Sequence, residues 1–129
     1  MFLSLDNHFT AKGRLTREPL ANYSDKGNLV TSITIAQKTP FKDSNGEPQI
    51  AYITYTAIDT GNNKIATNLA DFATKGSPIT LEGYMDSYSK VDGQTGEIIY
   101  TEIKRISSFR VEESKQETAK RREKNNTQK

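Results

Sequence analysis

The stretch that decides the fold is residues 29–37, LVTSITIAQ, followed after a loop by residues 50–58, IAYITYTAI. In both segments β-branched and aromatic residues alternate with period two, which is typical of strands that bury one face. The residues between them are rich in turn formers, and Asn45-Gly46 is a favoured hairpin tip. We therefore predict two long antiparallel strands joined by a hairpin.

Further strands flank this hairpin on both sides. Residues 8–15 predict a strand that ends before Pro19, and residues 79–90 and 97–111 predict a second hairpin. A single helix is expected between the third and fourth of these five strands. That order is the connectivity of an OB-fold, an all-β, five-stranded Greek-key barrel.

The expected helix lies around residues 65–73, where Ile65, Leu69 and Phe72 recur at helical spacing. We expect these three side chains to close one end of the barrel. Residues 61–63, Gly-Asn-Asn, offer an N-cap, and Gly76 is expected as a left-handed C-terminal cap.

Composition divides the chain into three parts. We predict an N-terminal arm over residues 1–6, the OB-fold domain over 7–112 and a disordered basic tail over 113–129. Residues 114–129 carry six basic and two acidic side chains, a net charge of +4, so the rest of the chain carries −2. The bulk charge of the domain is therefore no evidence for a nucleic-acid ligand.

Several classes of function are excluded or disfavoured by residue content. The 129 residues contain no cysteine and one histidine, His8, which argues against thiolate or multi-imidazole metal sites and leaves no convincing catalytic triad. The carboxylates are scattered, and no phosphate-binding glycine loop is present, so we expect neither an enzyme nor a cofactor. No apolar run approaches the roughly 20 residues of a membrane span, and no secretory signal is recognised, so a cytoplasmic location is the default expectation.

Large rings recur through the predicted strands. They are Phe41, Tyr52, Tyr55, Tyr84, Tyr88 and Tyr100. Rings on the solvent face of a sheet can stack on the bases of a single nucleic-acid strand. Tyr52 and Tyr55 must lie on opposite faces, and a shift of one residue decides which is buried. We favour the register in which Tyr52, Thr54 and Ile58 face outward, because Ile53 and Ala57 then face the core; the reverse register would bury Tyr52.

Several short motifs carry a family likeness. They are Gly13-Arg14-Leu15-Thr16, Glu18-Pro19, Ile33-Thr34-Ile35-Ala36, Leu69-Ala70-Asp71-Phe72, Lys75-Gly76-Ser77 and Leu81-Glu82-Gly83. In this order and spacing, residues 7–111 resemble bacterial-type single-stranded DNA-binding proteins. The resemblance implies an OB-fold that coats single-stranded DNA without sequence specificity during replication, repair or DNA transfer.

The resemblance also implies a set of stacking positions. Carried onto this chain they fall near Phe41, on Tyr52, on Ile58 and near Tyr88. The candidate phosphate contacts are Lys12, Arg14, Lys38, Lys42, Lys90 and Lys104, because cations that neutralise phosphates release counterions. Arg14 is the strongest of these candidates, and the Thr54 hydroxyl lies beside the stacking face.

The chain departs from the family pattern at several places. Ile58 replaces a usual aromatic ring, tryptophan is absent, and the first strand is polar. The acidic C-terminal tip that docks partner proteins in the family is replaced here by basic residues. We expect a divergent member, carried on a plasmid, phage or other mobile element, that forms a dimer or tetramer, with a monomer left open. The alternatives are an OB-fold module that binds protein, or an RNA-binding barrel, with weakened binding of single-stranded DNA.

Overall fold

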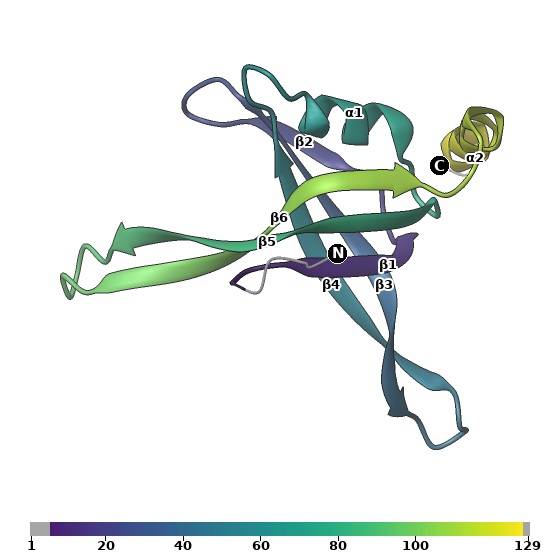
Figure 1. Ribbon diagram of the computed structural model, residues 1–129, viewed down its shortest axis with the longest axis horizontal. Coiled ribbons are helices and arrows are strands. Elements are labelled where there is room, and N and C mark those ends of the chain that lie inside the picture. The colour runs from purple at the N-terminus through teal and green to yellow at the C-terminus, as the bar shows by residue number, and fades with distance from the viewer. Residues whose placement is uncertain (1–5, 128–129) are drawn as a thin grey trace.

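The computed structural model describes residues 6–127 and confirms an OB-fold barrel (Figure 1). Its strands are β1 (Phe9–Leu15), β2 (Leu20–Tyr23), β3 (Leu29–Lys42), β4 (Pro48–Ile58), β5 (Pro78–Val91) and β6 (Ile98–Val111). The sheet runs β1-β5-β6-β4-β3, and pairing of β1 with β3 closes it into five strands. All neighbours are antiparallel except β4 and β6, which meet in parallel at Thr56 and Arg105. The predicted strand order is confirmed.

The short strand β2 was not anticipated. It pairs only with β3, outside the closed barrel, and all four of its residues are exposed. The four residues that follow Pro19 do not alternate between apolar and polar side chains. The sequence pattern therefore did not reveal β2.

The barrel interior is filled by the inward side chains of the alternating strands. Its most buried members include Ile33, Ile35, Ile79 and Leu81. The Tyr55 ring is also inside, 4 % exposed, with its centroid 5.3 Å from that of Phe9. Its hydroxyl donates to the Gln37 side-chain oxygen over 2.6 Å, so the polar end of the buried ring is satisfied.

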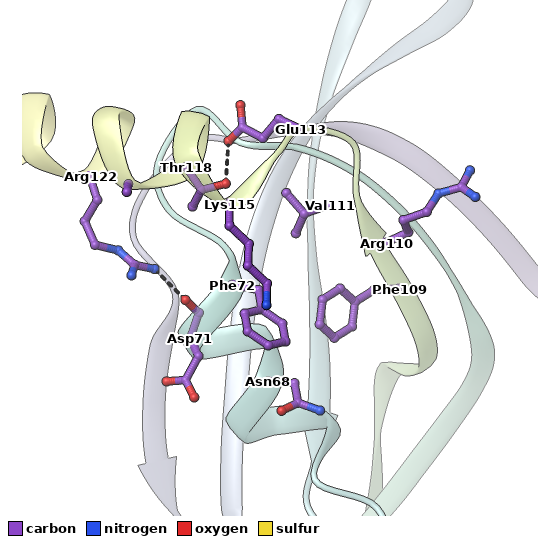
Figure 2. Close-up of a pocket in the computed structure, with 11 residues that line it drawn as sticks. Asn68, Asp71, Phe72, Phe109, Arg110, Val111, Glu113, Lys115, Thr118 and Arg122 are labelled. Carbon is purple, nitrogen blue, oxygen red and sulfur yellow. Dashed lines mark hydrogen bonds between the residues drawn. The ribbon is translucent and has the colours of Figure 1, made fainter.

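Helix α1 (Ile65–Phe72) closes one end of the barrel with Ile65, Ala66 and Leu69. The expectation that Phe72 joins them is wrong, because its side chain remains 43 % exposed. Phe72 is the last residue of the helix and points toward the C-terminal helix described below, away from the barrel interior (Figure 2).

Both predicted caps of α1 are replaced by other groups. The carboxylate of Asp59 accepts hydrogen bonds from the backbone N–H groups of Ala66 at 2.7 Å and Thr67 at 3.0 Å. These are the donors that an N-cap side chain normally satisfies, but Asp59 reaches them from the end of β4. Gly76 does have a left-handed φ of 90°, yet the helix has already ended, and Gly76 lies in the turn closed by Ser77 N–H and Thr74 C=O.

Two glycines are required where backbones approach closely. A Cβ on Gly83 would lie 1.7 Å from the Arg105 carbonyl oxygen, beside the register shift that bends β5 against β6. A Cβ on Gly13 would lie 2.3 Å from the Ala36 carbonyl oxygen, where β1 crosses to β3. Both positions keep the barrel closed, and neither admits a side chain.

Two long hairpins leave the barrel in different directions, as Figure 1 shows for β3–β4 and β5–β6. Strand β3 continues through residues 39–42, which the sequence predicts as loop, with a register shift between Lys38 and Lys42. The two tips are the turns around Gly46 and Gly96, both with positive φ.

The tail differs from the predicted disorder, because residues 115–127 form helix α2 (Lys115–Thr127). Polar contacts hold it against the barrel. Glu113, just before the helix, accepts from Arg121 at 2.9 Å and from Thr118 at 3.1 Å. Arg122 donates to the carbonyl oxygens of Asp71 and Ala73 at the end of α1. The helix has almost no apolar face, so hydrophobic periodicity could not reveal its docking. The predicted N-terminal arm lies outside the described residues except for Asp6.

Candidate nucleic-acid interface

A cleft opens on the outer surface where β4 and β6 diverge. The two strands touch at Thr56 and Arg105, and toward their N-terminal ends they separate into the two hairpins (Figure 1). The cleft has a volume of about 420 Å³. Its lining residues are Tyr52, Ile53, Thr54, Thr56, Glu102, Ile103 and Lys104. An open hollow between two β-hairpins suits an extended polymer better than a small compact ligand.

Tyr52 is the most prominent side chain of this cleft, with 68 % of its surface exposed. Tyr55, three residues later, is buried, so the predicted outward register of β4 is confirmed. Ala36 on β3 lies directly opposite Tyr52, and Arg14 on β1 lies directly opposite Ala36. The neighbour of Tyr52 on β3 is therefore a small residue, which leaves most of the ring uncovered.

Next to this row, the outer surface is covered by small hydroxyl groups. The Thr34 and Thr54 oxygens are 2.9 Å apart across β3 and β4, and those of Ser32 and Thr56 are 3.3 Å apart. Arg17 donates from Nη2 to the Thr34 hydroxyl at 3.1 Å. Hydroxyl and guanidinium groups of this kind are common donors to phosphate oxygens.

The other predicted stacking residues are spread over the two hairpins. Phe41 is 71 % exposed near the tip of β3–β4, and Tyr88 is 51 % exposed on β5, opposite Thr101. Ile58 shares the outer face of β4 but is mostly buried, opposite Val30 and outside the cleft lining. The structure thus brings Tyr52 and Thr54 together, places Phe41 and Tyr88 on separate arms, and leaves Ile58 apart.

The predicted cations fall into two groups. Lys38, Lys42 and Lys90 are exposed along the two hairpins, and Lys104 lines the cleft. Arg14 and Lys12 do not reach the cleft lining. The Arg14 guanidinium is bound to the Gly76 carbonyl oxygen at 3.0 Å, and Lys12 lies opposite Thr80 on β5.

Sequence reasoning missed two residues of this surface, Arg17 and Arg105, and named Tyr84 only as one of the large rings, without placing it in the site. Arg105 and Tyr84 continue the outer row that begins at Ser32 and Thr56, because each lies opposite the next across the sheet. Tyr84 is 41 % exposed, and Arg105 Nε bonds to an Asp86 oxygen at 3.2 Å. Only the register across four strands joins these residues, and no local motif signals it.

The carboxylate of Asp86 is held in its charged form. The backbone N–H of Ser87 and the side chain of Arg105 hydrogen-bond to it, and together they lower the pKa of Asp86 below its ordinary value. The pair partly neutralises Arg105, so this arginine is a weaker phosphate donor than its position suggests.

A second and larger hollow, of about 580 Å³, lies between α1, the end of β6 and α2. Figure 2 shows Phe72 and Phe109 at its centre, and the Lys115 Nζ atom is 5.5 Å from the centroid of the Phe72 ring. Glu113, Thr118 and Arg122 on its border are already engaged in the contacts that hold α2. Figure 1 places α2 on the side of the barrel away from the β5–β6 tip, so this hollow is separate from the cleft.

Two negative findings apply to residues 6–127. No group of three or more His, Cys, Asp or Glu side chains is arranged to hold a metal ion in this part of the chain. Neither helix described there has the length and apolar character that a bilayer span requires.

The fold and cleft define an OB-fold protein that exposes rings, hydroxyls and cations along one surface. The model of the "Single-strand binding protein family" matches residues 6–110. The chain is 37 % identical over 111 residues to "Single-stranded DNA-binding protein 2" of Streptococcus agalactiae serotype V, covering 84 % of this chain and 79 % of the relative. It therefore belongs to the single-strand binding protein family.

Two further relatives show how much of the chain is shared. "Single-stranded DNA-binding protein 3" of Listeria innocua serovar 6a is 31 % identical over 122 residues, covering 95 % of this chain and 73 % of the relative. "Single-stranded DNA-binding protein" of Lactiplantibacillus plantarum is 31 % identical over 106 residues, 82 % of this chain. The match spans 50 % of that longer relative.

Proposed function

We propose that this protein binds single-stranded DNA along the β4–β6 cleft without base-sequence preference, and that it acts as a binding protein, not an enzyme. The observation that carries the proposal is the exposed Tyr52 ring beside the hydroxyls of Thr54 and Thr56 and the cation of Lys104. Stacking on a ring accepts any base, and contacts to phosphate carry no sequence information. Family membership and the names of the relatives support the same ligand.

The remaining predicted residues belong to this proposal as contacts along the two hairpins. Phe41 and Tyr88 would stack further bases, while Lys38, Lys42 and Lys90 would follow the backbone. Arg14 and Lys12 have weaker support, because Arg14 is bound to a backbone carbonyl and both lie away from the cleft. We propose that the protein coats single-stranded DNA in replication, repair or DNA transfer, in the cytoplasm.

A dimer or tetramer is part of the same proposal. Strand β1 pairs with β3 only at Arg14 and Leu15, so residues 9–13 have β5 as their one strand neighbour among the described residues. Free backbone donors and acceptors along such an edge can pair with another strand. Light scattering with and without a long oligonucleotide measures the number of subunits directly.

The binding proposal is tested by replacing Tyr52 with alanine. Loss of one stacked base weakens affinity by about 1–3 kcal/mol, or roughly 5- to 150-fold. Anisotropy of a labelled oligo(dT) measures the effect, and a matched oligo(rU) tests the RNA alternative. Tyr23→Ala is the matched control, because Tyr23 is 77 % exposed on β2, outside the cleft. Equal affinity of Tyr52→Ala and the parent protein, or an equal loss in Tyr23→Ala, would contradict the proposal.

A further inference from the structure

We propose that Arg17 is the phosphate anchor of the cleft, a role that rests on the proposed binding of single-stranded DNA. Arg17 lies just after β1, in the bend that leads to Pro19. Its side chain crosses the outer face of β3 and donates to the Thr34 hydroxyl at 3.1 Å. The Thr34 oxygen is 2.9 Å from that of Thr54, which lines the cleft.

Arg17 differs from the other arginines of the described chain in what its guanidinium binds. Three of them are paired with carboxylates, and the two others donate to backbone carbonyl oxygens. The pairs are Arg105–Asp86, Arg110–Glu112 and Arg121–Glu113, and the carbonyl-bound residues are Arg14 and Arg122. In residues 6–127, Arg17 has no carboxylate within ion-pair distance and one hydrogen bond, to a neutral hydroxyl. A guanidinium with spare donors and an unneutralised charge suits a phosphodiester.

The hydroxyl pair extends this donor set into the cleft. Because Thr34 accepts from Arg17, its own hydroxyl hydrogen can be given to Thr54, and the Thr54 hydrogen is then available to a ligand. Hydrogen bonds in such a chain strengthen one another when the first donor is charged. Arg17, Thr34 and Thr54 therefore act as one phosphate-binding unit.

The distance from this unit to the stacking ring also fits a nucleotide. Tyr52 and Thr54 are two residues apart on the same face of β4, a separation of roughly 7 Å along the strand. A nucleotide whose base stacks on Tyr52 thus places a neighbouring phosphate within reach of Arg17. The unit and the ring together would hold one nucleotide by its two ends.

Arg17→Gln tests the inference, because glutamine keeps a hydrogen-bond donor for Thr34 and removes the charge. Affinity for a labelled oligo(dT) of about 10 nucleotides, enough for one OB-fold, is measured over a range of salt concentration. Loss of one phosphate contact lowers the slope of log K against log[salt] by about 0.7. We expect this change in Arg17→Gln, the parent slope in Arg17→Lys, and an equal loss of affinity for oligo(dA) and oligo(dC).

The matched control is Lys26→Gln, which removes one positive charge in the β2–β3 turn, away from the cleft lining. An unchanged slope in Arg17→Gln, with the parent protein binding normally, would overturn the role of Arg17 but not the proposed function. The same drop in Lys26→Gln would also overturn it, because the effect would then reflect net charge alone. Failure of the parent protein to bind any oligonucleotide would instead refute the proposed function.

Discussion

Replacement of Asp59 by alanine tests how helix α1 is held on the barrel. Asp59 is 6 % exposed, and its carboxylate accepts from the backbone N–H groups of Ala66 and Thr67 and from the Thr67 hydroxyl. The substitution removes the only side-chain partner that the structure shows for those two N–H groups. Lys64, the residue at the N-cap position, makes no capping hydrogen bond.

The expected loss follows from these contacts. Removal of an N-cap acceptor costs about 0.5–2 kcal/mol, and each buried donor left unpaired adds roughly 1–3 kcal/mol if water cannot replace the carboxylate. Water reaches the start of α1 in part, because residues 60–64 are exposed. We therefore expect the free energy of unfolding to fall by about 2–3 kcal/mol, which lowers Tm by roughly 8–12 °C.

Urea and thermal unfolding at one fixed protein concentration measure this loss, since subunit association would otherwise shift the midpoint. Asp59→Asn keeps an acceptor oxygen and loses only the charge, so we expect about 1 kcal/mol. Asp25→Ala, in the exposed β2–β3 turn, is the control and should be neutral. A loss below 0.5 kcal/mol in Asp59→Ala, about the lower limit for a cap, would refute the assignment of Asp59 as the cap of α1.

Two other predictions concern helix α2 and the close approach of β5 to β6 at Gly83. Burial raises the pKa of Glu113, but hydrogen bonds from Arg121 and Thr118 and the charge of Arg121 outweigh it, so the net pKa lies below the ordinary value of a glutamate. The stabilisation that ionised Glu113 gives to the docked helix α2 is therefore complete above the unfolded-state pKa of this residue. It is lost as pH falls through the lower folded-state pKa. Helix α2 should undock as pH falls below the ordinary titration range of a glutamate, seen as faster amide exchange in α2, and Glu113→Gln should weaken this pH dependence. Protection of α2 that is unchanged on acidification through that range and below it would contradict this. Gly83→Ala should unfold or severely destabilise the barrel, because its Cβ would overlap the Arg105 carbonyl, whereas Gly93→Ala, with open space around it, should be tolerated in the same thermal unfolding assay. Similar Tm values for the two variants would contradict this prediction, because β5 and β6 would then be able to move apart at Gly83.

Much of the architecture follows from local sequence patterns. The alternation in residues 29–37 and 50–58 places Tyr52 outward and Tyr55 inward, because side chains of a strand alternate between its faces. Asn45-Gly46 and the glycine-rich turn at residues 92–96 mark both hairpin tips. These features depend on neighbours within a few residues, so the chain alone specifies them.

Contacts between distant segments were decided only by the tertiary structure. Asp59 replaces the predicted asparagine cap because β4 ends beside the first turn of α1. Helix α2 docks through an ion pair and through hydrogen bonds to backbone carbonyl oxygens. Because these contacts are polar, residues 115–127 show no hydrophobic periodicity that could predict them. Arg17 reaches Thr34 and Thr54 only because β1, β3 and β4 are neighbours in the closed barrel. Periodicity reports which face of an element is buried, whereas the partner of a polar group is set by the three-dimensional register of elements far apart in the chain.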